Sequence, residues 1–345
     1  MEEDKKTVTQ YDVAKAAGVT RSMVSYVISG NTERSVAPET RRKILEAIET
    51  LGYRPNKAAQ ALQQGDVALA FRRIGIIIHA PDVFRRPYYA EIIEGIYTFA
   101  HKNNFEIAFI RFFYEFENPV LFNKLIHEEE IGSLILIALE KDVQNSGDKL
   151  ILKMKERIKK IVCVEWKFSG LSSVYFDRKA AGKKDTEYLI ACGYYDISYI
   201  GERDERIDGV KEALAEHSLQ NGSASDIVVG AAFDINSGYA AIKKLHEQNR
   251  LSRAIVCGSD EVAMGVLCYL NEFDIAVPKR VAVISIDNID MSGYTSPPLT
   301  TLNIQKTEMG AMAVELIVSD RAGQDEHAVE MTLPTVIVER KSCCN

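Results

Sequence analysis

TQYDVAKAAGVTRSMVSYVI, residues 9–28, decides the fold of the first part of the chain, because it holds the signals for two short helices and the turn between them. Thr9 can cap the first helix, and Asp12 stands three residues later, in the reciprocal position of a capping box. Gly18 follows at the turn, where a residue without a Cβ atom takes a positive φ at little cost. Thr20 can then cap the second helix. The stretch therefore predicts a helix-turn-helix unit.

The second predicted helix has two unlike faces. Its apolar face, which we expect to pack, consists of Met23, Val24, Val27 and Ile28. Its polar face consists of Arg21, Ser22, Ser25 and Tyr26. A helix of this length fits the major groove of B-DNA, where an arginine near its N-terminus can bond to guanine. The alternative interpretation is a helical hairpin whose polar face is only solvated.

Positive charge is concentrated in this part of the chain. The whole protein of 345 residues carries a net charge of −7, which by itself argues against binding to nucleic acid. The first 65 residues, however, hold ten Lys or Arg against eight Asp or Glu, a net of +2, so the remainder carries −9. A basic head on an acidic body is the distribution that contacts with DNA phosphates require.

Two further segments follow the helix pair. Residues 38–51 predict a third helix, because Pro38 suits a first turn, apolar residues recur at helical spacing, and Gly52 ends the pattern. Residues 53–62 suit a helix of only about two turns with almost no apolar face, so we expect it to be helical only against a partner. The alternative is a flexible linker, which we also expect over residues 63–73.

From Ile74 onward, short apolar strands alternate with amphipathic helices. Eight strands are predicted in two rounds, at 74–80, 105–113, 133–139, 160–166, 196–202, 226–230, 253–259 and 281–287. Near-continuous apolar strands separated by helices indicate parallel sheets covered on both faces. We therefore expect two similar α/β lobes of doubly wound parallel sheets, with the chain crossing between them near 169–177 and 287–303.

Polar and aromatic residues gather where these strands end. Ligands of open α/β sheets bind beyond the carboxyl ends of the strands, where carboxylates and guanidinium groups can bond to hydroxyls and aromatic rings can stack. Any one of these residues could instead cap a helix or lie on the surface. The set predicts a pocket for a sugar or similar polar metabolite and includes Pro81, Phe84, Arg85, Arg86, Tyr88, Glu165, Trp166, Glu202, Arg203, Arg206, Phe233, Asn236, Ser259, Asp260, Asp287 and Asn288.

The sequence contains none of the common catalytic motifs. GxGxxG after a strand, GxxxxGK[ST], HExxH and GxSxG are all absent, and the six histidines have no metal-ligand spacing. We therefore predict that the protein is not an enzyme and uses no cofactor or metal.

The cysteines and the N-terminus indicate a cytoplasmic protein. The six cysteines show no paired CxxC spacing, so we expect reduced thiols, with Cys343 and Cys344 in a frayed tail. The N-terminus has no apolar signal segment, and no apolar run approaches the length of a membrane span. We expect no association with a membrane.

Taken together, these segments resemble the lactose-repressor/galactose-repressor (LacI/GalR) family of bacterial transcription regulators. VTQYDVAKAAGVTRSMVSYVISG is similar to the family's VTxxDVAxxAGVSxxTVSRVLN, and VAPETRRKILEAIETLGYRPNKAAQAL is similar to VSxxTRxxVxxAIxxLGYxPNxxARxL. Further on, PYYAEIIEGI, YLIACGYYDISYIGE, RIDGVKEAL, CGSDEVAMGVL, VISIDN and PPLTTLNIQ occur in the family's order. The resemblance runs nearly from end to end.

The resemblance implies DNA contacts by two elements of the first 62 residues. The second helix would enter the major groove, with Arg21, Ser22 and Tyr26 at base-reading positions and Thr9, Thr20, Ser25 and Asn31 at phosphate positions. A hinge helix would fold in the minor groove through Asn56, Lys57, Ala59 and Leu62, with Leu62 wedged between base pairs. The expected partner is double-stranded, pseudo-palindromic operator DNA.

The resemblance also implies a core like that of periplasmic sugar-binding proteins. It divides the chain into a headpiece (1–53), a hinge helix and linker (54–73), and a core that binds an effector and forms a homodimer (74–345), with a tetramer left open. By position, the effector contacts would be Glu165, Arg206, Phe233, Ser259 and Asp287. Such a regulator would work in the bacterial cytoplasm, at the nucleoid.

The sequence departs from the family pattern at several positions. Tyr26 stands where an arginine is common, so the operator half-site could differ. Arg85 and Arg86 stand where many relatives carry asparagine, and Glu165, Trp166 and Ser259 are not the usual choices in a sugar pocket. The ligand could therefore be larger, aromatic or anionic.

The predicted function is a sequence-specific, DNA-binding repressor whose operator affinity is controlled by a small metabolite bound between the lobes. Two alternatives come from other classes. One is a cytoplasmic solute-binding protein with an incidental helical head, and the other is a DNA-bending protein that needs no ligand.

Overall fold

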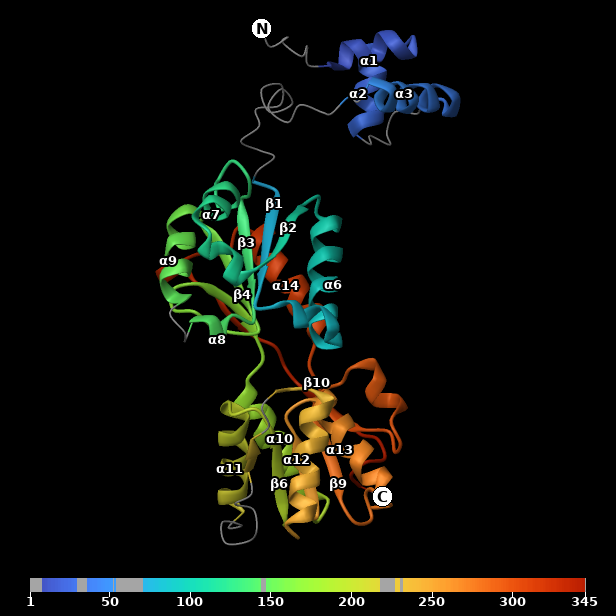
Figure 1. Ribbon diagram of the computed structural model, residues 1–345. Coiled ribbons are helices and arrows are strands. Elements are labelled where there is room, and N and C mark those ends of the chain that lie inside the picture. The colour runs from blue at the N-terminus through green and yellow to red at the C-terminus, as the bar shows by residue number, and fades with distance from the viewer. Residues whose placement is uncertain are drawn as a thin grey trace. The chain divides into compact units, whose positions relative to one another are not determined.

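The computed structural model describes residues 8–29, 36–51, 53, 71–143, 147–217, 227–229 and 232–344. The chain forms two compact units, Met1–Ala70 and Phe71–Asn345. Figure 1 shows the three helices of the first unit and the two α/β lobes of the second.

The first unit contains three helices around a small apolar core. They are α1 (Gln10–Ala17), α2 (Arg21–Ser29) and α3 (Pro38–Leu51), as the sequence predicts. Thr9 and Asp12 form the expected capping box, and Gly18 ends α1 with a φ of 64°. The buried core consists of Val13, Ala14, Val24, Val27, Ile44, Ala47 and Tyr53. Met23 differs from the prediction because its side chain is 41% exposed.

The second unit contains two six-stranded sheets, one in each lobe. The first sheet has the order β11-β5-β4-β3-β1-β2, and all its neighbouring strands are parallel. Its strands are β1 (Arg73–Ile78), β2 (Glu106–Phe112), β3 (Ser133–Ile137), β4 (Lys160–Val164), β5 (Ser172–Tyr175) and β11 (Glu330–Thr332). Its flanking helices are α6 (Pro87–Lys102), α7 (Pro119–Leu125), α9 (Asp148–Arg157) and α14 (Lys306–Val318).

The second sheet has the order β12-β10-β9-β8-β6-β7, and only its edge strand β12 is antiparallel. Its strands are β6 (Ile197–Gly201), β7 (Ile227–Val229), β8 (Ala254–Cys257), β9 (Ala282–Asp287), β10 (Thr300–Asn303) and β12 (Val336–Val338). Its flanking helices are α10 (Arg178–Ala191), α11 (Glu205–Glu216), α12 (Ile235–Glu247) and α13 (Asp260–Glu272).

Each sheet has an apolar cluster on both faces, so its central strands are apolar over most of their length. β1 shows this pattern, because Ile76 and Ile78 pack in one cluster while Ile77 packs in the other. The sheets are therefore sandwiched between helices, which is the doubly wound arrangement that the sequence predicts. In the part of the chain that the structure describes, no helix combines the length and the apolar character needed to span a bilayer.

The chain passes between the lobes at three places rather than the two that the sequence predicts. β5 occupies part of the expected crossing at 169–177 and pairs with β4 before the chain leaves the first lobe. The second crossing joins β10 to α14, which returns to the first lobe. The third joins β11 to β12, so the last two strands belong to different sheets.

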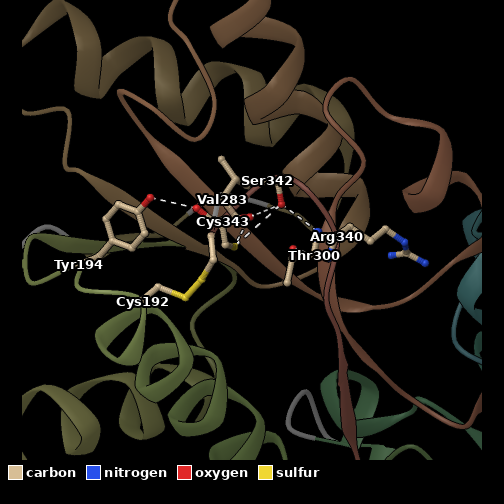
Figure 2. Close-up of a disulfide and its surroundings, with 8 residues drawn as sticks. Cys192, Tyr194, Val283, Thr300, Arg340, Ser342 and Cys343 are labelled. Atoms are coloured by element: carbon tan, nitrogen blue, oxygen red, sulfur yellow. Dashed lines mark hydrogen bonds between the residues drawn. A yellow bond between two sulfur atoms is a disulfide. The ribbon is translucent and has the colours of Figure 1, made fainter.

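The C-terminal tail corrects the expectation of reduced thiols and a frayed end. Cys192 and Cys344 form a disulfide, with their Cα atoms 5.9 Å apart (Figure 2). The preceding residue, Cys343, is fully buried, and its thiol donates to the carbonyl oxygen of Val283 at 2.9 Å. Spacing along the chain could not show this pairing, because 152 residues separate the two partners.

Candidate functional site

The candidate DNA-binding surface is the exposed side of α2. Val24 and Val27 are buried in the core of the first unit, so the polar residues of α2 point outward. Arg21 and Ser22 are exposed in the first turn, and Arg21 Nε donates to Gln10 Oε1 at 3.4 Å. The helix therefore offers a guanidinium and hydroxyl groups at its N-terminal end, where a recognition helix contacts bases.

The structure describes four of the other predicted DNA-binding residues, and they differ in exposure. Thr9 and Thr20 are exposed at the starts of α1 and α2, whereas Ser25 and Tyr26 are half-buried on α2. The Thr20 hydroxyl also accepts from the Met23 amide at 3.4 Å, which caps α2 as expected. Asn31, Asn56, Lys57, Ala59 and Leu62 lie outside the described residues.

The candidate effector site is a cavity of about 790 Å³ at the carboxyl ends of the strands of both lobes. It brings together eight of the ten predicted effector residues: Arg85, Arg86, Tyr88, Glu165, Arg206, Phe233, Ser259 and Asp287. The volume lies in the range of small-molecule sites. Parallel strands explain this convergence, because their carboxyl ends meet at the same edge of each sheet.

Two predicted effector residues do not line this cavity. Phe84 is 53% exposed and packs edge-on against Phe112, with ring centroids 6.0 Å apart. Trp166 is buried in the outer cluster of the first lobe, and its indole nitrogen donates to the carbonyl oxygen of Leu136 at 3.0 Å. β4 ends at Val164 and Glu165 has a φ of 75°, so the chain turns at this point, with Glu165 at the cavity and Trp166 in the core.

Glu165 is the centre of a hydrogen-bond network that joins the first-lobe wall to the start of α10. Its carboxylate accepts from the Tyr88 hydroxyl at 2.8 Å and from the Arg178 guanidinium. Arg178 also donates to Glu140, at 2.6 Å. Burial and then the negative charge of Glu165 raise the pKa of Tyr88, so this hydroxyl keeps its proton and remains a donor. The network fixes two polar side chains at the wall before any ligand arrives.

The aromatic ring of Phe233 lies close to two guanidinium groups at the cavity. The Arg206 guanidinium lies 4.8 Å from the ring centroid and the Arg86 guanidinium lies 5.9 Å from it. Arg206 is bonded to Asp204, yet its buried Nε has no hydrogen-bond partner among the residues that the structure describes. A buried donor without a partner is costly, so a ligand acceptor at this position would remove a penalty. The cavity is thus prepared for a polar ligand with a flat face.

Asp287 ends β9 at the back of the cavity with a φ of 125° and an almost fully buried side chain. Burial, and next the neighbouring carboxylate of Asp260, raise the pKa of Asp287 well above its usual value. The Lys306 ammonium donates to the backbone oxygens of Asp287 and Asn288, at 2.6 and 3.2 Å. This ammonium fixes the strand end at the place where the chain crosses between the lobes.

Sequence reasoning missed three residues that shape this cavity. Arg178 follows the cap of α10 and donates to Glu165, while Glu261 lies in the first turn of α13 and accepts from Arg86 Nε at 3.0 Å. Lys141 donates to Glu202 at 2.6 Å. All three stand at the starts of helices rather than in the loops that directly follow the strands, and Lys141 lies in α8 (Glu140–Asp142). The start of each helix that follows a strand end was the available signal.

Two stretches of the chain match known protein families. Residues 9–56 match the family described as bacterial regulatory proteins, lacI family, and residues 186–343 match the periplasmic binding protein-like domain. The HTH-type transcriptional repressor PurR of Histophilus somni (strain 2336) is 28% identical over 339 residues, which cover 95% of this chain and 97% of that protein. The chain carries a lacI-family DNA-binding domain and a periplasmic binding protein-like domain. PurR of Pasteurella multocida (strain Pm70) is likewise 28% identical, over 342 residues and 97% of its length.

Solved structures share the fold of this chain. The lac repressor dimer bound to operator and the anti-inducer ONPF has a TM-score of 0.73 at 20% identity, covering 99% of this chain and 100% of that one. The CelR–cellobiose complex has a TM-score of 0.67 at 24% identity, covering 97% and 99%. These likenesses establish the fold. With a lacI-family DNA-binding domain and repressors as its relatives, the chain is a DNA-binding transcription regulator and not an enzyme.

Proposed function

We propose that this regulator is a repressor that binds a pseudo-palindromic operator as a homodimer and is controlled by a small polar effector in the cavity between its lobes. One observation carries the proposal: a helix-turn-helix unit and a preformed cavity of about 790 Å³ occur in the same chain. Operator half-sites related by a two-fold axis require two copies of α2. Its place of action would be the cytoplasm, at the nucleoid.

The proposed DNA contacts are those of α2 and of the hinge segment. Arg21, Ser22 and Tyr26 would contact bases, and Thr9, Thr20, Ser25 and Asn31 would contact phosphates. Asn56, Lys57, Ala59 and Leu62 would form the minor-groove helix, with Leu62 as the wedge. The exposed first turn of α2 supports the base contacts.

The proposed effector is a sugar or a related polar or anionic compound with a planar or ring face. Phe233 would stack on the face, while Arg206 Nε, Glu165 and Tyr88 would bond to the ligand's polar groups. Binding energy would favour one arrangement of the lobes and thereby change operator affinity, with a coupling of about 1–3 kcal/mol. We expect release from the operator on ligand binding, and co-repression is the alternative.

A thermal-shift panel of sugars, sugar phosphates, nucleosides and purine bases tests the effector class. A ligand present at about 100 times its dissociation constant adds about 2.7 kcal/mol to stability. Each hit is then added to a gel-shift assay with DNA from the adjacent promoter. A ligand that binds but leaves operator affinity unchanged would contradict the allosteric function, and failure to bind any promoter DNA would contradict the repressor function. Sedimentation of the purified protein tests the dimer and any further pairing.

A further inference from the structure

The C-terminal tail runs along the second lobe as a strap that ends in a disulfide. Ser342 Oγ donates to the backbone oxygen of Val283 on β9 at 2.6 Å and accepts from the amide of Thr300 on β10 at 2.8 Å. The neighbouring Cys343 backbone oxygen accepts from the Tyr194 hydroxyl at 3.0 Å (Figure 2). Cys344 then bonds to Cys192, the residue that caps the end of α10. The strap therefore holds β9, β10 and α10 together.

The other end of the strap reaches the wall of the cavity. Arg340 donates through Nη2 to the Asn288 side-chain oxygen at 2.8 Å, and through Nη1 to the Leu299 backbone oxygen at 2.7 Å. Asn288 follows Asp287, which lines the cavity. A continuous path of bonds thus joins the disulfide to the effector site.

The two bonded cysteines are open to reagents, whereas most of the other thiols are not. Cys192 and Cys344 are each partly exposed, but Cys163, Cys257 and Cys343 are buried. A small thiol should therefore reach this disulfide more readily than it reaches the buried thiols. Disulfides of cytoplasmic proteins are as a rule transient and often sense redox state, because the thiol pool of that compartment reduces accessible bonds.

We propose that the Cys192–Cys344 disulfide is a reversible redox switch that fastens the tail strap when oxidised and releases it when reduced. This inference takes from the proposed function only that the protein works in the cytoplasm. Oxidation needs a small-molecule disulfide as the electron acceptor. One cysteine thiolate attacks it to form a mixed disulfide and expels a thiolate, and the second cysteine thiolate then displaces the other small thiolate. The two released thiolates take up the two protons that the cysteines lost.

Redox titration of the full chain tests the switch. The protein is equilibrated in glutathione buffers of different oxidised-to-reduced ratio, free thiols are alkylated, and the Cys192–Cys344 peptide is quantified by mass spectrometry. We expect the bond to form in the oxidising buffers and to open in millimolar reduced glutathione, and to form again on return. In the reduced state, amide exchange at 340–344 and 288–292 should rise about tenfold, because the strap loses its anchor.

Two variants separate the switch from a general effect on folding. Cys344→Ser should show the fast exchange in every buffer, whereas Cys268→Ser, at an exposed free thiol on α13, should behave as the parent. A bond that resists millimolar reduced glutathione, or one that never forms in oxidised glutathione, would overturn the proposal. Equal exchange in the two states would also overturn it. None of these readouts uses DNA, so they are independent of whether the protein represses.

Discussion

The guanidinium of Arg21 stands in the first turn of α2, exposed and 3.4 Å from the side-chain oxygen of Gln10. Replacing Arg21 by alanine should cost about 1–3 kcal/mol of operator affinity and relax the preference at one base position, since a bidentate contact to guanine would be lost. Competition binding with single-base operator variants measures this. Arg41→Ala, at an exposed position on α3, is the control. An equal loss on all sequences would make Arg21 a phosphate contact instead.

The buried carboxylate of Glu165 accepts hydrogen bonds from Tyr88 and Arg178. Glu165→Gln should lower the free energy of unfolding by about 1–3 kcal/mol, because a partly buried guanidinium loses one of its two carboxylate partners. Urea unfolding measures the change, and effector titration should show a parallel loss of affinity.

Glu330→Gln is the matched control, because its carboxylate lies in an exposed pair with Lys167. Its effect should stay within about 0.5 kcal/mol. If the two variants lose the same small amount of stability, Glu165 does not organise the wall.

At the scale of elements, α13 is tied to two strands through the first residue of the helix. Asp260 accepts from Ser285 on β9 and Thr301 on β10, both at 2.5 Å, and from the Ile289 amide at 2.8 Å. Burial raises the pKa of Asp260 to about 6. Because the folded state holds this proton more tightly than the unfolded chain does, its contribution to stability is complete below about pH 4 and is lost as pH rises through about 6.

Asp260→Asn should remove this part of the pH dependence. The stability of the parent relative to the variant should fall between about pH 4 and 6 by an amount on the order of 1–3 kcal/mol, and change little above that range. Urea unfolding at several pH values measures the difference. Asp274→Asn, at an exposed position beyond the same helix, should follow the parent. Parallel curves for the parent and Asp260→Asn would contradict the assignment.

At the scale of the whole core, several ion pairs join the lobes at the cavity, and two of them start from Arg86 and Lys141 of the first lobe. Arg86 Nε lies 3.0 Å from Glu261 Oε2, and Lys141 Nζ lies 2.6 Å from Glu202 Oε2. The first pair is the better shielded, with side chains 20% and 15% exposed. It should therefore contribute more to holding the lobes together than an exposed pair would.

Glu261→Gln should favour separation of the lobes and weaken effector binding by about tenfold, the equivalent of about 1.4 kcal/mol. Small-angle scattering of the free protein and titration with the effector measure the two effects. Glu272→Gln, at the other end of α13, is the control because its carboxylate bonds to Tyr239 within the second lobe. An unchanged radius of gyration together with unchanged affinity would show that the ion pair has no part in closure.

Local patterns in the sequence indicated the three helices of the first unit, eight of the strands and the kind of residue at the site, but not β5, β10, β11 or β12. These signals depend on residues that are close together in the sequence, so a single sequence reveals them. Examples are the cap and the glycine at the two ends of α1 and the helical spacing of apolar residues in α3. The rule that parallel strands end at one edge also placed Arg86, Glu165 and Asp287 in one cavity.

Only the tertiary structure decided which distant groups meet. Arg178 with Glu165, Arg86 with Glu261, and Cys192 with Cys344 are partners whose contact depends on how the two sheets and the tail are packed. The packing of the core also decides that β11 and β12 join different sheets, although they are neighbours in the sequence. The physical reason is that periodicity records which side of an element is buried, whereas pairing between elements is settled by the packing of the complete core.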